Sequence, residues 1–188
     1  GGVADMTWSV RSITKTMLPV LAALTSLEIS MGLVLSSFES TLFHYPTLLV
    51  LVPVTIGTAG SLGSILSARL STAFHLGLLE FKASNYHLTG NILSTMALSI
   101  TIFPLIGVAT WVVSTIVFEP LLGLYQIVLI TTLSGVLISI FIAIVALLTT
   151  YTSYLLKLDP DDVVIPIVTN LCDVFGILVL LTTIFFFV

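Results

Sequence analysis

The stretch that decides the fold is the C-terminal run VVIPIVTNLCDVFGILVLLTTIFFFV, residues 163–188. A helix needs about 20 apolar residues to cross a bilayer, and this run is longer. Its only charged residue is Asp173. At about 1.5 Å per residue, Asp173 lies about 15 Å from Val163, the middle of a hydrocarbon layer about 30 Å thick.

A stripe of polar and small residues follows one face of this predicted helix. Its members lie at positions i, i+3, i+4, i+7 and i+10, which are Pro166, Thr169, Asn170, Asp173 and Gly176. An acid at mid-membrane costs about 2.5 to 3.5 kcal/mol on insertion scales, so it indicates a functional site. The alternative is that Asp173 only hydrogen-bonds a neighbouring helix.

The composition places the whole chain in a membrane. Of 188 residues, 57% are hydrophobic and 7% are charged, and the mean hydropathy is +1.24. Soluble domains carry about 25% charged residues, so a soluble globule is excluded. The apolar runs lack the alternation of outer-membrane strands, which predicts helices. No basic patch suggests nucleic acid, and the single cysteine, Cys172, excludes an intrachain disulfide.

We therefore expect an all-α integral membrane protein with five spans in the lipid bilayer. Residues 1–16 are expected to lie at the membrane surface, and residues 17–188 to form one transmembrane domain. Pro19 is expected in the first turn of the first helix, residues 39–45 in a loop, and Pro104 at a kink. The predicted spans are 17–38, 46–68, 89–118, 121–150 and 163–188.

The second span is unusually rich in small residues. Pairs such as Gly57 with Ser61 and Gly60 with Ser64 have the small-xxx-small spacing that allows helices to approach closely in lipid. Together with Pro53, the glycines predict a bent or locally opened helix whose carbonyls line a polar cavity.

The basic residues predict the orientation. With five spans, all of them fall on one side of the membrane, which the positive-inside rule makes cytoplasmic. The N-terminus is then inside and the C-terminus outside. An odd number of spans excludes two equal inverted halves, so a pseudo-symmetric pore requires a second copy of the chain. The five basic residues are Arg11, Lys15, Arg69, Lys82 and Lys157.

A second buried acid completes a candidate cation site. Glu28 lies about 17 Å into the first span, a depth similar to that of Asp173. Two acids without an intramembrane base describe a site for a cation, and Mg²⁺ prefers oxygen ligands while keeping several of its waters. A softer metal would recruit Cys or His, but the histidines fall in predicted loops: His44, His75 and His87. Glu39 is expected at the outer end of the first span.

Two stretches resemble a known family. The run from Pro53 to Gly77, PVTIGTAGSLGSILSARLSTAFHLG, resembles the second-helix signature of MgtE-type magnesium transporters and of their eukaryotic solute-carrier relatives. The run from Asp159 to Gly176, DPDDVVIPIVTNLCDVFG, resembles their fifth helix. The five spans and their orientation agree, so the resemblance covers nearly the whole chain.

The resemblance implies a homodimeric pore in which Asp173 of each subunit faces the central axis and holds a hydrated Mg²⁺. Thr169 matches the position one turn earlier whose carbonyl helps line the site, and Gly176 matches the following glycine. The chain departs from the family at Ala59–Gly63, AGSLG, where many members have GGNxG. It has no room for the cytoplasmic Mg²⁺-sensing domains of full-length MgtE, so we expect a bare pore domain, or half of the duplicated solute-carrier form.

The function expected from the sequence is transport of Mg²⁺ across the plasma membrane by a homodimer. The metal ligands would be Asp173, Thr169 and Glu28, and the pore would be lined by Asn170, Gly176, Pro166, Gly57, Gly60, Ser61 and Ser64. The alternatives are a proton-coupled carrier that uses Glu28 and a non-transporting membrane subunit. No enzyme motif is present, so we expect no catalytic activity.

Overall fold

A computed structural model of the chain describes residues 10–79, 85–117, 121–156 and 159–188, with the backbone alone at 10–13, 16 and 160–162. The described residues are helical, without strands, which confirms the all-helical class. Five helices are long and apolar enough to cross a membrane. The elements are α1 (Val10–Ser37), α2 (Glu39–His44), α3 (Pro46–His75), α4 (Tyr86–Val117), α5 (Leu124–Leu156) and α6 (Pro160–Phe187).

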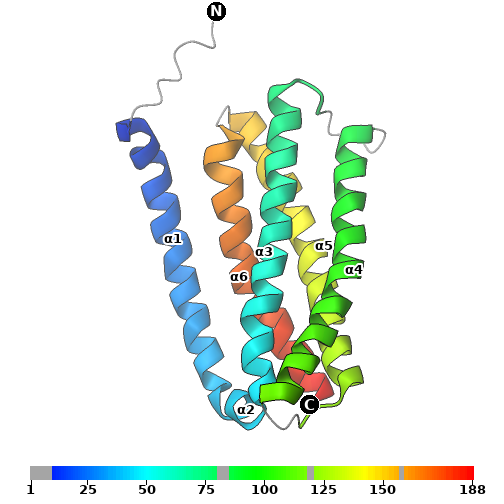
Figure 1. The fold of residues 1–188 in the computed structure, drawn as a ribbon. Coiled ribbons are helices and arrows are strands. Elements are labelled where there is room, and N and C mark those ends of the chain that lie inside the picture. Colours follow the sequence, from blue (N-terminus) through cyan, green and yellow to red (C-terminus); the bar gives the residue numbers. More distant parts are fainter. Residues whose placement is uncertain (1–9, 80–84, 118–120, 157–158) are drawn as a thin grey trace, which may run out of the picture.

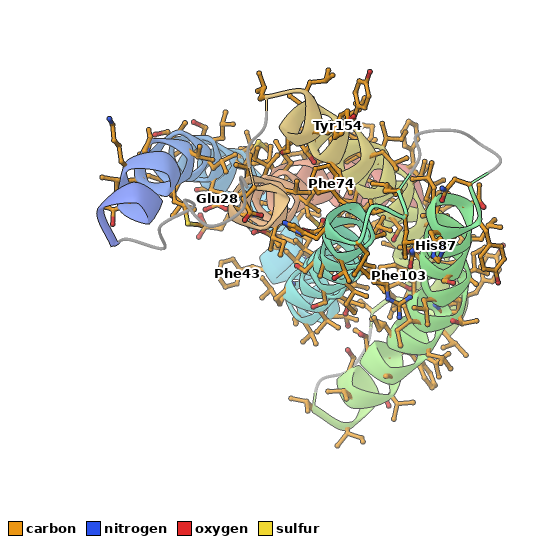
Figure 2. All side chains as sticks on the ribbon, turned by 90° about the horizontal axis from the view of Figure 1, so that it is seen from above. Glu28, Phe43, Phe74, His87, Phe103 and Tyr154 are labelled. Atoms are coloured by element: carbon orange, nitrogen blue, oxygen red, sulfur yellow. The ribbon has the colours of Figure 1, made fainter. Side chains whose placement is uncertain are left out.

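The five long helices run side by side, and α6 lies between α1 and the other three (Figures 1 and 2). Helices α1, α4 and α6 begin at one end of the bundle, and α3 and α5 end there; this end is called the upper end (Figure 1). The short helix α2 lies at the opposite, lower end. The predicted basic side corresponds to the upper end, where Lys15 and Arg69 are described; Lys82 and Lys157 lie outside the described residues.

Three local predictions differ from the structure. Helix α1 begins at Val10, because residues 10–16 contain no Gly or Pro to stop it, and Pro19 therefore lies inside the helix, not in its first turn. Residues 39–44 form helix α2 instead of a loop, since Leu42 is buried in the lower core and its N–H donates to the carbonyl of Phe38 at 3.0 Å. Residues 1–9 lie outside the described part.

The prolines act differently in α3 and α4. Helix α3 continues through Pro53 without interruption, so the opened stretch expected there is wrong. A proline removes one backbone hydrogen bond, but the bonds of the neighbouring turns hold the helix together. Helix α4 contains Pro104 and changes direction in its lower half (Figure 1), as a proline kink predicts.

Close packing without large polar groups holds α4 and α5 together. Phe103 is fully buried, and its ring lies where a Cβ atom at Gly135 would be. One turn away, the Ser99 hydroxyl donates to the Ser139 hydroxyl at 2.9 Å. Small residues and interhelical hydrogen bonds of this kind are what bind helices in lipid. Helix α5 also packs against α3 and α6, and α4 packs against α3, so these two helices form a scaffold for the bundle.

We predict that Gly135→Ala destabilises the protein by about 1 to 3 kcal/mol, because the added methyl group overlaps the Phe103 ring. The matched control is Gly90→Ala on α4, where a Cβ atom meets nothing within 4 Å. That change should be neutral or stabilising by up to about 1 kcal/mol. Unfolding in detergent would be followed by circular dichroism. Equal stability of the two variants would contradict the packing described for Phe103.

Candidate functional site

Helix α6 has a buried face and a half-buried polar face. The buried face repeats at every fourth residue and packs against α3 and α5: Val164, Val168, Cys172, Gly176, Leu180 and Ile184. The predicted polar stripe lies beside this face, where Pro166, Thr169, Asn170 and Asp173 are half-buried. Gly176 belongs to both, so the stripe borders the helix interface rather than facing lipid alone.

Small residues bring α3 and α6 together at the level of Asp173. The thiol of Cys172, the residue before Asp173, lies 3.7 Å from the carbonyl oxygen of Ile56. A Cβ atom at Gly60 would lie 3.9 Å from the Cys172 sulfur, and one at Gly176 would lie 3.2 Å from the Ile56 side chain. The contact at Gly176 is therefore tight enough to favour glycine, whereas the one at Gly60 is an ordinary van der Waals contact that leaves room for a methyl group.

Helix α1 presents Glu28 to α6. Among the described elements, α1 packs only against α6 and α2. Its buried residues Leu24 and Met31 lie one turn on either side of Glu28, which is half-buried. Figure 2 shows Glu28 between α1 and α6. The negative charges of Glu28 and Asp173 are close enough to repel each other.

The two carboxyl groups lie at the same depth. Asp173 is ten residues from one end of its span and fourteen from the other. Glu28 is eleven and nine residues from the ends of its span. The prediction from the sequence put both acids at mid-membrane, and the structure adds that their helices, α1 and α6, pack against each other.

No described basic side chain lies within ion-pair distance of either acid. Lys15 is thirteen residues from Glu28 on the same helix, a separation of about 20 Å. Arg69 is nine residues from Gly60, or about 14 Å along α3. A cation is the partner that would offset the repulsion between Glu28 and Asp173.

Hydroxyl and amide donors near the acids bond to their own helices. Thr169 donates to the carbonyl of Ile165 at 3.0 Å, and the Asn170 amide nitrogen donates to that of Pro166 at 2.8 Å. On α3, Ser61 and Ser64 each donate to the glycine carbonyl four residues earlier, at 2.9 Å. In these hydrogen bonds the hydroxyl and amide protons point toward backbone carbonyls, so the side-chain oxygens keep lone pairs for a cation.

The structure brings together only some of the predicted lining residues. Gly60 and Ser64 are half-buried, whereas Gly57 and Ser61 are exposed on the outer side of α3. The second pair therefore does not take part in the contact between α3 and α6 within one chain.

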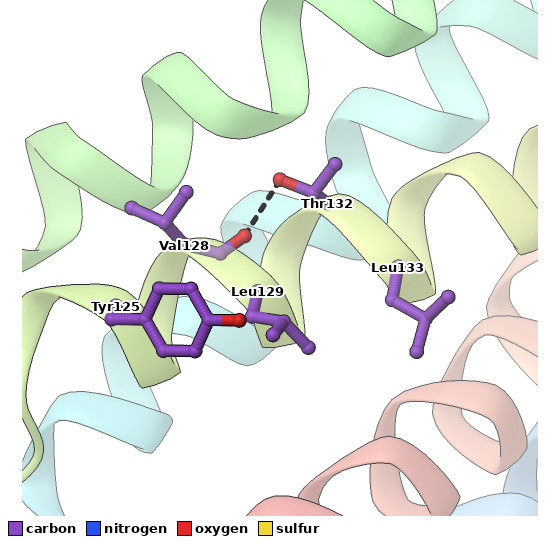
Figure 3. Close-up of a pocket in the computed structure, with 5 residues that line it drawn as sticks. All are labelled: Tyr125, Val128, Leu129, Thr132 and Leu133. Atoms are coloured by element: carbon purple, nitrogen blue, oxygen red, sulfur yellow. Dashed lines mark hydrogen bonds between the residues drawn. The ribbon is translucent and has the colours of Figure 1, made fainter.

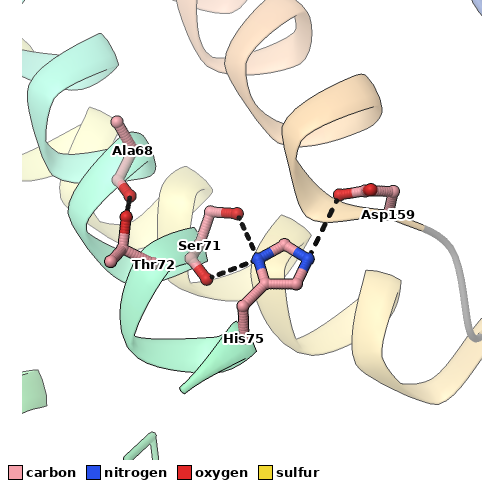
Figure 4. A network of polar contacts seen from close by, with 5 residues as sticks. All are labelled: Ala68, Ser71, Thr72, His75 and Asp159. Carbon is pink, nitrogen blue, oxygen red and sulfur yellow. Dashed lines mark hydrogen bonds and ion pairs between the residues drawn. The ribbon is translucent and has the colours of Figure 1, made fainter. Parts of the chain in front are cut away.

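The histidines are on the surface, but in helices rather than in the predicted loops. His44 and His87 are exposed in α2 and α4. His75 ends α3, where its Nε2 atom lies 3.6 Å from the Asp159 carboxylate and its Nδ1 atom 3.0 Å from the carbonyl of Ser71 (Figure 4). This contact joins the upper ends of α3 and α6. Sequence reasoning missed it, because 84 residues separate the partners and no motif signals the pairing.

The described residues contain no group of three or more His, Cys, Asp or Glu side chains that could enclose a metal ion. Two carboxylates with oxygen-bearing neighbours fit an ion that keeps part of its water shell. A hollow of about 370 Å³ on the lower part of α5 is mainly apolar, so it does not suit a cation (Figure 3). Its lining residues are Tyr125, Val128, Leu129, Thr132 and Leu133.

We predict that Glu28→Gln and Asp173→Asn each stabilise the metal-free protein, because either change removes the same repulsion. The double variant should gain less unfolding free energy than the two single variants gain together, by about 0.5 to 3 kcal/mol. Chemical unfolding in detergent with a chelator would measure this coupling. Fully additive effects would mean that the two charges do not interact.

Comparison with known proteins identifies the family of this chain. A sequence model of the MgtE family, described as a divalent cation transporter, matches residues 52–183, more than two thirds of the chain. The match includes Asp173, Thr169 and the small residues of α3, but not Glu28. No curated protein and no solved structure matches the chain. The chain therefore belongs to the MgtE family of divalent cation transporters.

Proposed function

We propose that this protein carries Mg²⁺ through the membrane along a path lined by α3 and α6. The observation that supports this most directly is the pair of half-buried acids, Glu28 and Asp173, at mid-span on the packed helices α1 and α6. Buried like charges are costly unless an opposite charge accompanies them. A divalent cation carries the charge that two carboxylates need.

Oxygen chemistry favours Mg²⁺ over softer metals at this place. The nearby groups are carboxylates, hydroxyls and an amide, whereas the Cys172 thiol is buried against the Ile56 carbonyl of α3 and the described histidines are all exposed. Mg²⁺ accepts one or two carboxylates and retains several waters. Asp173 would be the main ligand, Glu28 a second carboxylate from α1, and Thr169 an additional oxygen one turn away.

The membrane potential would supply the driving force for uptake. A potential of 100 mV is worth about 2.3 kcal/mol per elementary charge, so a divalent ion gains about twice that. Attraction by the carboxylates would draw the ion in, and exchange of a few hydration waters would let it pass. No further energy source is needed for inward flux.

A homodimer would complete the pathway. In one chain, Gly57 and Ser61 leave an exposed strip of small residues on α3, a strip that a second helix could approach closely. The exposed strip, the polar residue Asn170 and the neighbouring Pro166, both half-buried, would then line the central axis. Two copies related by a two-fold axis would place two Asp173 side chains around one path.

The orientation follows from Lys15 and Arg69, which the structure describes near the upper end. We propose that this end faces the cytoplasm, with the N-terminus inside, the C-terminus outside and the protein in the plasma membrane.

A proton-coupled carrier is the second candidate, and the closeness of Glu28 to Asp173 favours it. Acidic side chains inside a membrane are groups through which carriers exchange protons. Binding of Mg²⁺ would then release a proton. Dependence of the flux on an imposed pH gradient, lost in Glu28→Gln, would distinguish this carrier from a channel.

We predict that Asp173→Asn lowers Mg²⁺ influx into liposomes under an inside-negative potential by at least about tenfold. The loss of one charged ligand is expected to weaken ion binding by more than about 1.4 kcal/mol. The control is Glu39→Gln, which removes an exposed acid at the lower end of the bundle. It should change the flux by less than about twofold, because exposed charges are screened.

Both variants must be shown to remain folded and in the same oligomeric state as the wild type. Equal flux through Asp173→Asn and wild type would remove Asp173 from the path. A folded wild type without any flux would favour the non-transporting membrane subunit.

A further inference from the structure

A hollow of about 510 Å³ lies between the upper ends of α3 and α4, apart from the carboxyl groups. It combines an apolar wall with a few polar groups. Figure 2 shows one of these, His87, on the side of α4 toward α3. The lining residues are Ala68, Arg69, Thr72, Ala73, Leu76, Leu78, His87 and Asn91.

Hydrogen bonds fix two of the polar wall groups, the side chains of Thr72 and Asn91. The Thr72 hydroxyl donates to the carbonyl of Ala68 at 2.9 Å, and the Asn91 amide donates to that of His87 at 2.7 Å. Within the described residues, the exposed Arg69 makes neither an ion pair nor a hydrogen bond. The described residues that line the hollow also include no acid. The strongest donor in the hollow is therefore a guanidinium, which matches an oxyanion such as phosphate.

The depth of Arg69 matches that of lipid phosphates. Gly60 lies at the level of the mid-membrane residue Asp173, and Arg69 is nine residues further along α3. This corresponds to about 14 Å, close to the edge of a hydrocarbon core whose half-thickness is about 15 Å. One turn toward the bilayer centre, Ile65 is 45% exposed and offers an apolar surface. A cation above an exposed apolar surface suits a molecule with an anionic head and a hydrocarbon tail.

We propose that this hollow binds an anionic phospholipid of the leaflet at the upper end. Arg69 holds the phosphate, and the surface around Ala68 and Ile65 receives the start of an acyl chain. A zwitterionic lipid is disfavoured, because its ammonium group would lie near the unpaired guanidinium. The site is independent of the proposed transport function.

The test is native mass spectrometry of the full chain in a non-ionic detergent, with titration of dioleoyl phosphatidylglycerol. Arg69→Gln should weaken binding of the first lipid by about fivefold, the effect of removing one basic charge near a membrane surface. Leu76→Trp, which fills the hollow from an exposed position, should weaken it as well. The control Lys15→Gln removes an exposed charge on α1, outside the hollow, and should leave binding unchanged.

Dioleoyl phosphatidylcholine should bind the wild type more weakly than phosphatidylglycerol does, and millimolar inorganic phosphate should not displace the lipid. Phosphatidylglycerol binding that is equal in wild type and Arg69→Gln would overturn the proposal. So would equal binding of the two lipids. Complete displacement by inorganic phosphate would identify a site for free phosphate instead. Loss of the hollow on dimerisation, measured as dimers that bind no lipid while monomers do, would assign it to contacts between copies.

Discussion

The repulsion between Glu28 and Asp173 is the constraint on which the proposed function depends. Lipid cannot solvate two carboxylates, and the described bases are too far along their helices to pair with them. In the proposed function a cation accompanies the two acids. An ion between the acids would turn a repulsive contact into an attractive one, so the proposed function would link ion occupancy to the position of α1.

Helix α1 is the element whose position would change most easily with ion binding. Only 6% of its span is buried, compared with 50% for α5, so few packing contacts hold it in place. It also lies outside the residues that match the family model. The site thus has a firmly packed part, Asp173 on α6 against α3, and a loosely packed part, Glu28 on α1. Movement of α1 relative to α6 would change the distance between the two acids without disturbing the scaffold of α4 and α5.

The sequence predicted the number and class of the helices well, because membrane spans depend on a one-dimensional property, the length of an apolar run. Predictions that depended on contacts were less successful. The helix at residues 39–44 forms because Leu42 reaches a core made by distant residues, and α3 remains intact at Pro53 because its neighbouring turns are packed. His75 was expected in a loop, yet it ends a helix beside Asp159, 84 positions away. None of these partners can be read from local residue patterns.

By itself, the sequence determined that this is a five-span helical membrane protein with acids at mid-depth in its first and last spans, and it indicated the family through two long motifs. Hydropathy, helix periodicity and residue spacing are sufficient for that, since they act along one helix at a time. Only the tertiary structure decided that the helices carrying the two acids pack together, that Gly60 and Gly176 lie at the interface of α3 with α6, and that Gly57 and Ser61 remain exposed. The rotation and neighbours of each helix depend on packing between helices, and packing is a property of the whole bundle.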